Sequence, residues 1–123
     1  MKKALVTGGA GFIGSHLVDQ LINMGINVTI IDNLSTGKKE NINPKAKFIE
    51  CDISIASYID LTSYLNDIDI IFHLAAKTTV QESIENPILY NNINVKGTLK
   101  LLEVASAMKV KRFIFSSSSS VYG

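Results

Sequence analysis

Short runs of apolar and β-branched residues alternate along this chain with longer segments in which apolar residues recur every three or four positions. The short runs predict β-strands, and the longer segments predict amphipathic helices. The predicted strands are residues 3–7, 27–32, 47–50, 69–74 and 112–116. Within them, positions 28–31 and 70–74 are apolar almost throughout. Such runs are typical of strands buried on both faces of a parallel sheet.

Three helices are expected between these strands, over residues 12–24, 56–66 and 87–108. Gly25 stands where a glycine commonly ends a helix, and Asn86 followed by Pro87 is a typical helix start with the asparagine as N-cap. Residues 33–46 are polar and predict an irregular connection. Strands that alternate with helices indicate right-handed βαβ units. We therefore expect a doubly wound parallel sheet of about five strands in one α/β domain over residues 1–123.

The composition supports a globular domain and excludes several classes of protein. Of 123 residues, 46% are hydrophobic and 19% are charged, which excludes intrinsic disorder. The net charge of +1 gives no electrostatic reason to expect binding to nucleic acid or to a membrane surface. No apolar stretch of the sequence approaches the roughly 20 residues of a membrane span. Cys51 is the single cysteine, so an intrachain disulfide is excluded and a reducing, cytoplasmic location is expected.

A glycine-rich turn directly follows the first predicted strand. Gly8, Gly11 and Gly14 recur at intervals of three and open the first predicted helix. Glycines permit a tight turn, let the backbone approach a pyrophosphate and allow a helix to pack closely on a strand, while the helix N-terminus attracts the anion. The alternative is a glycine-rich turn without a ligand. The strand before it, the helix after it and an acidic residue after the second strand favour dinucleotide binding in a Rossmann-type fold.

That acidic residue is Asp32, eighteen positions after Gly14. A carboxylate there can accept hydrogen bonds from the ribose hydroxyls of NAD and repels the 2′-phosphate of NADP, so the sequence favours NAD. Lys38 and Lys39 follow closely and would weaken that repulsion. The alternative interpretation of Asp32 is an exposed turn residue without a ligand.

Several further residues near strand ends have two interpretations. The carboxylate of Asp52, after the third strand, would either meet the adenine amino group or cap a helix. His73 lies within the fourth strand and is interpreted as a buried, hydrogen-bonded structural residue rather than a catalytic base. Lys77 and Asn94 are each either a cofactor contact or an ordinary exposed polar residue. Residues 116–120 are serines that either face the site from the fifth strand or form a serine-rich turn. No group of residues has the spacing of a metal site.

Five segments together resemble the extended short-chain dehydrogenase/reductases. Within that group the resemblance is to the NAD-dependent nucleotide-sugar epimerase/dehydratase family, especially its UDP-glucose 4-epimerase-like members. The segments are TGGAGFIGSH, DNLSTGKKENI, HLAA, NNINVKGTLKLLE and FIFSSSSSVYG. They follow one another in the family's order and cover essentially the whole chain, so the resemblance is specific.

The resemblance implies roles for individual residues. Phe12 and Ile13 would flank the pyrophosphate of NAD, and Asp52 and Ile53 would bracket the adenine. The adenosine would be surrounded by Asp32, Asn33, Leu34, Ser35, Thr36 and Gly37, with further cofactor contacts from Leu74, Ala75, Ala76 and Asn94. The family's catalytic serine falls on Ser118, which would hydrogen-bond the sugar hydroxyl that is oxidised.

Two departures from the family pattern bear on function. The family's Tyr-x-x-x-Lys pair lies beyond the catalytic serine, and Tyr122 belongs instead to the Val-Tyr-Gly motif. Neither that pair nor the family's C-terminal substrate-binding region is present in residues 1–123. We therefore expect the N-terminal portion of a nucleotide-sugar 4-epimerase that acts through transient oxidation to a 4-keto sugar. The resemblance further implies a UDP-sugar substrate and a homodimer at full length, and this portion alone is expected to be inactive.

Two alternative functions stay open at this point. The first is a nucleotide-sugar dehydratase or decarboxylase. The dehydratases carry Thr-Asp-Glu where this chain has Ser118, Ser119 and Ser120, so the acid needed for eliminating water is missing here. The second is a non-catalytic NAD-binding regulator. A downstream sequence without Tyr-x-x-x-Lys would favour the regulator.

Overall fold

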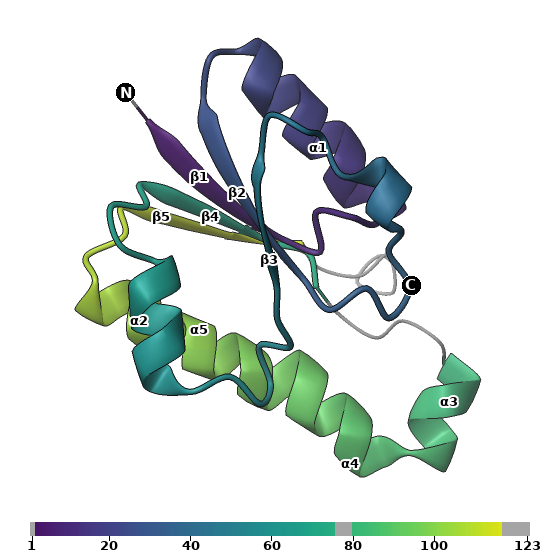
Figure 1. Ribbon diagram of the computed structural model, residues 1–123. Helices are drawn as coiled ribbons and strands as arrows, with labels where there is room; N and C mark the ends of the chain where they lie inside the picture. The colour runs from purple at the N-terminus through teal and green to yellow at the C-terminus, as the bar shows by residue number, and fades with distance from the viewer. Residues whose placement is uncertain (1, 76–79, 117–123) are drawn as a thin grey trace.

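The computed structural model describes residues 2–75 and 80–116, whose strands form one five-stranded sheet (Figure 1). The strands are β1 (Lys3–Thr7), β2 (Asn27–Asp32), β3 (Lys47–Glu50), β4 (Ile70–His73) and β5 (Arg112–Phe115). They are ordered β3-β2-β1-β4-β5, and every neighbouring pair is parallel. The predicted doubly wound, Rossmann-type sheet is confirmed, and each predicted strand matches an observed one to within one residue at either end.

The order of the strands reverses between β1 and β4. From β1 the chain moves outward through β2 to β3, and it then returns to the other side of β1 to form β4 and β5. In open parallel sheets, the connections on either side of such a reversal diverge and leave a crevice at the carboxyl ends of the strands. The residues that follow β1, β2 and β4 are therefore brought around one crevice.

Helices cover both faces of the sheet because successive strand residues point to opposite faces. One face is covered by α1 (Phe12–Asn23), and the other by α2 (Tyr58–Tyr64) and α5 (Gly97–Ala107) (Figure 1). The core on the α1 side contains Ala4, Val6, Val18, Leu21, Val28 and Ile30. The core on the other side includes Leu5, Ile31, Leu61, Leu65, Ile71, Leu101 and Val104. Neighbouring residues of β1 thus alternate between two cores, which explains why this strand is apolar on both faces.

The ends of α1 and α2 follow from local hydrogen bonding. Gly25 has φ of +80° after α1, and its amide donates to the carbonyl of Ile22 at 2.9 Å, so the predicted glycine C-cap is confirmed. The hydroxyl of Ser57 accepts from the amide of Asp60 at 3.0 Å and caps α2. This cap starts α2 at Tyr58, two residues later than predicted.

The long helix predicted over residues 87–108 is interrupted. It consists of α4 (Pro87–Tyr90), a π-helical turn η2 (Asn91–Lys96) and α5. Asn86 occupies the N-cap position as predicted, but within the described chain its side chain makes no capping hydrogen bond. A short helix, α3 (Val80–Glu85), and a 3₁₀ turn, η1 (Lys39–Asn41), were not predicted. None of the helices described is long and apolar enough to cross a membrane.

Candidate dinucleotide-binding site

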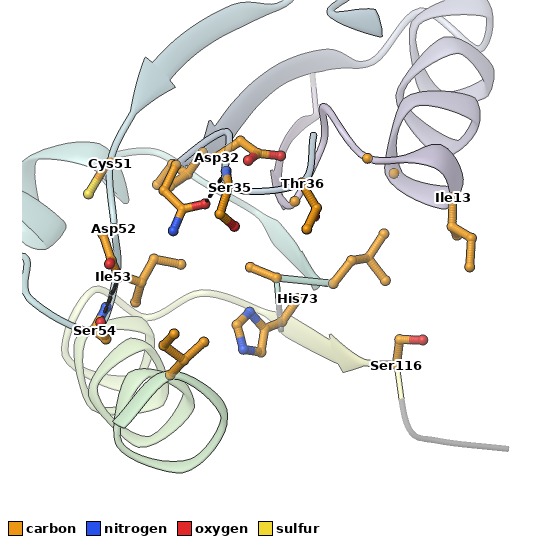
Figure 2. A pocket seen from close by; sticks show the side chains of 18 of the residues that line it. Ile13, Asp32, Ser35, Thr36, Cys51, Asp52, Ile53, Ser54, His73 and Ser116 are labelled. Carbon is orange, nitrogen blue, oxygen red and sulfur yellow. Dashed lines mark hydrogen bonds between the residues drawn. The ribbon is translucent and has the colours of Figure 1, made fainter. Parts of the chain in front are cut away.

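The carboxyl ends of β1, β2 and β4 border a cavity of about 450 Å³ (Figure 2). This volume lies in the usual range of small-molecule sites, roughly 300–1,000 Å³. The residues lining it are Gly8, Gly11, Phe12, Ile13, Gly14, Ile31, Asp32, Asn33, Ser35, Thr36, Cys51, Asp52, Ile53, Ser54, His73, Leu74, Ala75, Ile93 and Ser116. Most of the residues predicted to bind the cofactor therefore lie around one cavity.

The three regularly spaced glycines of the turn after β1, Gly8, Gly11 and Gly14, meet different steric demands. Gly8 has φ of +74°, and a Cβ built on it would lie 3.0 Å from the backbone nitrogen of Ala75. A Cβ on Gly14 would overlap the carbonyl oxygen of Gly8, so this glycine lets α1 pack directly on the turn. Among the described residues, a Cβ on Gly11 would meet only that same oxygen, at 3.3 Å. Gly8 and Gly14 are thus required by the fold, whereas Gly11 mainly keeps the cavity free of a side chain.

The N-terminus of α1 forms one wall of the cavity. Gly11 is its N-cap, and the amide of Ser15 donates to the Gly11 carbonyl at 2.9 Å, which closes the first helical turn. The amides of Phe12, Ile13 and Gly14 lie within that first turn, where helical amides have no carbonyl acceptor in the helix, and at the positive end of the helix dipole. The first turn, which is fully described, carries no acidic side chain to occupy these amides. This wall can therefore bind an anion such as a pyrophosphate.

Asp32 forms a second wall at the end of β2. Its side chain is only 7% exposed, so the alternative of an exposed turn residue is wrong. Its Oδ2 accepts from the amide of Ala10 at 3.0 Å, and its Oδ1 accepts from the amide of Leu34 at 2.7 Å. Leu34 adopts a left-handed conformation with φ of 60°, which turns its amide back toward the carboxylate. Backbone bonds from both sides therefore fix the position of Asp32.

Two residues of the segment after β2 support the site from behind instead of lining it. Asn33, Ser35 and Thr36 line the cavity, whereas Leu34 and Gly37, both described, do not. A Cβ on Gly37 would lie 2.9 Å from the carbonyl carbon of Ala10, and the next amide, that of Lys38, donates to the Ala10 carbonyl at 3.1 Å. Gly37 therefore lets this segment pack against the glycine turn.

The segment after β3 forms a third wall. Oδ1 of Asp52 accepts from the amide of Ser54 at 3.0 Å and from its hydroxyl at 2.6 Å. The alternative in which Asp52 caps a helix is wrong, because Ser57 caps α2. Ile53 beside it is buried. Cys51 also lines the cavity, and burial together with the neighbouring Asp52 carboxylate raises the pKa of its thiol, which keeps it protonated at neutral pH.

His73 is the buried structural residue that the sequence predicted, and it also lines the cavity. Its Nδ1 lies 2.7 Å from the hydroxyl oxygen of Thr7, and its Nε2 lies 2.8 Å from that of Thr98. Burial lowers the pKa of His73 to about 4, so the imidazole is neutral at pH 7. A neutral imidazole with a partner at both nitrogens fits a structural role better than that of a base.

The remaining predicted residues are distributed differently. Asn94 is half-buried and does not line the cavity within the described chain, whereas the preceding residue, Ile93, does. Ser116, the first of the serine run, lines the cavity, and its amide lies 3.4 Å from the carbonyl of His73 (Figure 2). Ala76, Lys77 and Ser118 lie outside the described residues.

Sequence reasoning did not assign Ile31, Cys51, Ser54, His73 or Ile93 to the cavity, although all five line it. Ser54 follows Asp52 closely in the sequence, so a short-range Asx-turn pattern could have identified it. Ile93 comes from the π-helical turn η2, and no local pattern marks that turn. In the part of the chain that the structure describes, no group of three or more His, Cys, Asp or Glu residues could hold a metal ion.

Comparison with known proteins agrees with this geometry. The family model described as "NAD dependent epimerase/dehydratase family" matches residues 4–123. UDP-glucose 4-epimerase from Streptococcus mutans is 42% identical over 97% of this chain and 36% of its own length. The solved UDP-N-acetylglucosamine 4-epimerase from Methanobrevibacter ruminantium, in complex with UDP-N-acetylmuramic acid, is 48% identical, with a TM-score of 0.90 over 99% of this chain and 39% of its own.

A third similar structure is the UDP-glucose 4-epimerase from Thermus thermophilus in complex with NAD. It is 36% identical, with a TM-score of 0.87 over 94% of this chain and 37% of its own. This chain thus spans well under half the length of the relatives it matches. NAD is the cofactor of the matching family, and the family model covers all but the first three residues of this chain. The chain belongs to the NAD-dependent epimerase/dehydratase family.

Proposed function

We propose that residues 1–123 form the NAD-binding domain of a nucleotide-sugar 4-epimerase. The observation that carries this proposal is that a buried carboxylate, Asp32, and the N-terminus of α1, which no side chain caps, lie on one cavity where the strand order reverses. A dinucleotide presents a pyrophosphate and a ribose diol only a few bonds apart. The two walls offer amides to the first group and a hydrogen-bond acceptor to the second.

The residues present fit the pyrophosphate because the hydrogen-bond donors of this wall are backbone amides. Gly11 lines the cavity without a side chain, and the amides of Phe12 and Ile13 are the donors closest to the positive end of α1. The side chains of Phe12 and Ile13 are 79% and 68% exposed and stay out of the core. In this proposal, the amides hold the pyrophosphate and the two apolar side chains flank it.

The residues present also fit an unphosphorylated ribose. Each oxygen of Asp32 accepts one backbone amide, and a carboxylate can accept about four hydrogen bonds in all. One further position on each oxygen can therefore accept from the two ribose hydroxyls. A 2′-phosphate would instead place close to two negative charges beside a buried carboxylate, which costs several kcal/mol. Lys38 and Lys39 are both exposed, and flexible exposed lysines offset only about 0–1 kcal/mol each.

Asp52 and Ile53 form the proposed adenine contact. Oδ1 of Asp52 is occupied by Ser54, which fixes the carboxylate and leaves Oδ2 to accept from the adenine amino group. Ile53 supplies apolar surface beside it. Leu74 and Ala75 complete the proposed cofactor contacts on the β4 side of the cavity.

When bound, NAD would supply a reversible hydride acceptor for the sugar. The role proposed for this chain is to bind that cofactor, exclude water from one side of it and orient it toward the sugar. Ser118 is the proposed hydrogen-bond partner of the sugar hydroxyl, by its position in the family's motif. The names of similar solved proteins, which include complexes with UDP-sugars, support a UDP-sugar as the substrate of the whole protein.

We also propose that the whole protein is a homodimer in the cytoplasm. Val95, Leu99 and Leu102 follow one another at spacings of four and three residues along η2 and α5, Ile88 precedes them in α4, and the four are 40–76% exposed. We call these four residues the apolar stripe. An exposed apolar row of this kind is typical of a surface covered by another polypeptide, and a second copy is the proposed partner. The single cysteine supports a reducing compartment.

The experiment that tests the proposed function is calorimetric titration of the chain with NAD and NADP, repeated with Asp32→Asn. We expect NAD to bind at least tenfold more tightly than NADP in the wild type. The substitution should shrink that ratio because the amide is uncharged and one of its two groups no longer accepts hydrogen bonds. Asp67→Asn is the matched control, because Asp67 is exposed and lies at the amino end of the sheet, before β4. An unchanged ratio in Asp32→Asn would show that Asp32 has no such role.

A further inference from the structure

His73 joins three segments that meet at the cavity, through side chains alone. Its imidazole lies between Thr7 at the end of β1 and Thr98 in the first turn of α5. The rings of Phe113 and Phe115 pack against the imidazole, each with its centroid 5.9 Å from that of the imidazole. None of these contacts is needed to form the sheet, whose strands pair through their backbones.

The directions of the hydrogen bonds around His73 follow from the groups at both ends. The hydroxyl of Thr98 donates to the carbonyl oxygen of Asn94 at 2.8 Å, because a carbonyl can only accept. With its one proton used, Thr98 can only accept from His73, so Nε2 carries the hydrogen. A neutral imidazole has one N–H, so Nδ1 is an acceptor and the hydroxyl of Thr7 donates to it.

Thr7 connects the imidazole to the cavity wall. Its hydroxyl oxygen accepts from the amides of Leu74 and Ala75, both at 3.0 Å. These bonds hold the backbone after β4 against the glycine turn, where a Cβ on Gly8 would lie 3.0 Å from the nitrogen of Ala75. A second hydrogen on the imidazole would compete with these amides for Thr7, because a hydroxyl oxygen has two acceptor positions.

At its other end the chain of hydrogen bonds reaches the π-helical turn. The Asn94 carbonyl that accepts from Thr98 belongs to η2, and the neighbouring Ile93 lines the cavity. Single turns of π-helix are often found at functional sites, because they displace side chains from the α-helical register. The Thr98 hydroxyl ties the displaced turn to His73 and, through it, to β1.

We propose that His73 is a positioning residue for the cofactor: as a neutral Nε2–H imidazole, it sets the distance between the Leu74–Ala75 backbone and the π-helical turn that carries Ile93. The proposal rests on the proposed function, because it takes the cavity as the NAD site. It assigns His73 no contact with reacting atoms and no proton transfer.

The test combines NAD affinity with nitrogen NMR of the imidazole. Thr98→Val removes one hydroxyl and leaves the Nε2–H without an acceptor. His73→Asn keeps an acceptor near Nδ1 for Thr7, whereas His73→Phe removes both bonds and keeps a ring. We expect a fall of about tenfold in NAD affinity for Thr98→Val and His73→Asn, since about 1.4 kcal/mol per lost bond corresponds to tenfold, and a larger fall for His73→Phe.

Thr62→Val is the matched control. Thr62 makes the same bond to the carbonyl four residues earlier, to Tyr58 at 2.7 Å, but on the exposed face of α2. We expect its NAD affinity to equal that of the wild type. The wild-type NMR spectrum should show hydrogen on Nε2 and none on Nδ1, and hydrogen exchange at the amides of Leu74 and Ala75 should accelerate in His73→Phe and stay slow in Thr62→Val.

The two proposals fail in different ways. If the wild type does not bind NAD, the proposed function fails. The tautomer of His73 and the exchange rates of the Leu74 and Ala75 amides then still test the hydrogen-bond network around His73. If the wild type binds NAD and every His73 and Thr98 variant binds it equally well, the positioning role is wrong while the NAD site stands. Hydrogen on Nδ1 in the wild type, or unchanged exchange at Leu74 and Ala75 in both His73 variants, would overturn the proposed network.

Discussion

The two halves of the sheet differ in how completely they are covered. Around β1, α1 and β2, the glycine turn and Asp32 are held by backbone hydrogen bonds, such as that from the Gly8 amide to the Ile31 carbonyl at 2.8 Å. The exposed apolar side chains of α1 lie at the cavity, as Phe12 and Ile13 do, or at the end of the helix, as Met24 does. Around β5 and α5, large apolar side chains that do not line the cavity face solvent: Phe115 is 56% exposed and Leu99 is 57% exposed. The first half therefore forms its part of the site with its own contacts. The second half offers apolar surface that another polypeptide would cover.

The largest expected effect concerns turnover. We expect no conversion of UDP-galactose to UDP-glucose by the 123-residue chain, because none of its tyrosines is followed by lysine four positions later. Residues 1–123 thus contain no candidate for the family's Tyr-x-x-x-Lys base. A coupled assay with purified chain measures this, with the Streptococcus mutans enzyme as positive control. Measurable conversion by the chain alone would show that residues 1–123 catalyse the reaction without a Tyr-x-x-x-Lys pair, which would contradict the prediction.

The next effect separates fold from binding within the glycine turn. Gly14→Ala should lower the free energy of unfolding by about 3–5 kcal/mol, because its Cβ would overlap the carbonyl oxygen of Gly8. Gly11 has an ordinary φ of −79°, and a Cβ there would lie 3.3 Å from the carbonyl oxygen of Gly8, a tight contact that a shift of a few tenths of an ångström relieves, so Gly11→Ala should cost about 1 kcal/mol, together with a clear loss of NAD affinity.

Urea denaturation and NAD titration of the two glycine variants check this pair. Gly25→Ala is the control, because Gly25 has φ of +80° and open space around it, so it should lose only about 1 kcal/mol and bind NAD normally. Equal losses of stability in Gly11→Ala and Gly14→Ala would show that the steric distinction between the glycines is wrong.

The lowered pKa of His73 predicts that the free energy of unfolding depends on pH. Its pKa is lowered to about 4 in the folded chain from an ordinary 6.5, and burial is the cause. Because folding favours the neutral form, the contribution of His73 is fully present above pH 6.5 and is lost as the pH falls toward 4. The shift corresponds to about 3 kcal/mol. Urea denaturation at pH 7 and pH 4 should show this part of the loss in the wild type but not in His73→Asn, and equal losses in both would contradict it.

A smaller effect is expected for association. Leu99→Lys places a charge in the middle of the apolar stripe and should weaken self-association of the chain by about tenfold or more, since burying one leucine is worth about 1.5–3 kcal/mol. Sedimentation equilibrium measures the change. Met24→Lys is the control, because Met24 is 72% exposed at the end of α1, on the other face of the sheet. A monomeric wild-type chain, or equal effects of both substitutions on self-association, would show that the apolar stripe is not the interface.

Much of the covered half could be predicted from sequence, because its features are local. The alternation of strand and helix, the spacing of Gly8, Gly11 and Gly14, and the place of Asp32 after β2 are all patterns of neighbouring residues. The burial of Asp32 was not predicted, because it depends on amides from Ala10 and Leu34 that fold back over it.

The less covered half was harder to predict for a physical reason. The π-helical turn η2 changes the register of backbone hydrogen bonds, but its own residues include no glycine or proline that would mark it, and α3 is too short to show a period. His73 reaches the cavity because β4 lies beside β1, and Ile93 reaches it because η2 lies against the same cavity. These are consequences of packing between segments far apart in the sequence.

The central claim is that the β1–α1–β2 half holds the pyrophosphate and the adenosine ribose of NAD with its own residues. Amide NMR spectra recorded during titration of the chain with NAD test it most directly. We predict saturable shifts at the amides of Gly11, Ile13 and Ser35, with unchanged signals for Gly25 and Asn66 at the opposite end of the sheet. The absence of saturable shifts, or shifts confined to residues outside the cavity, would contradict the claim.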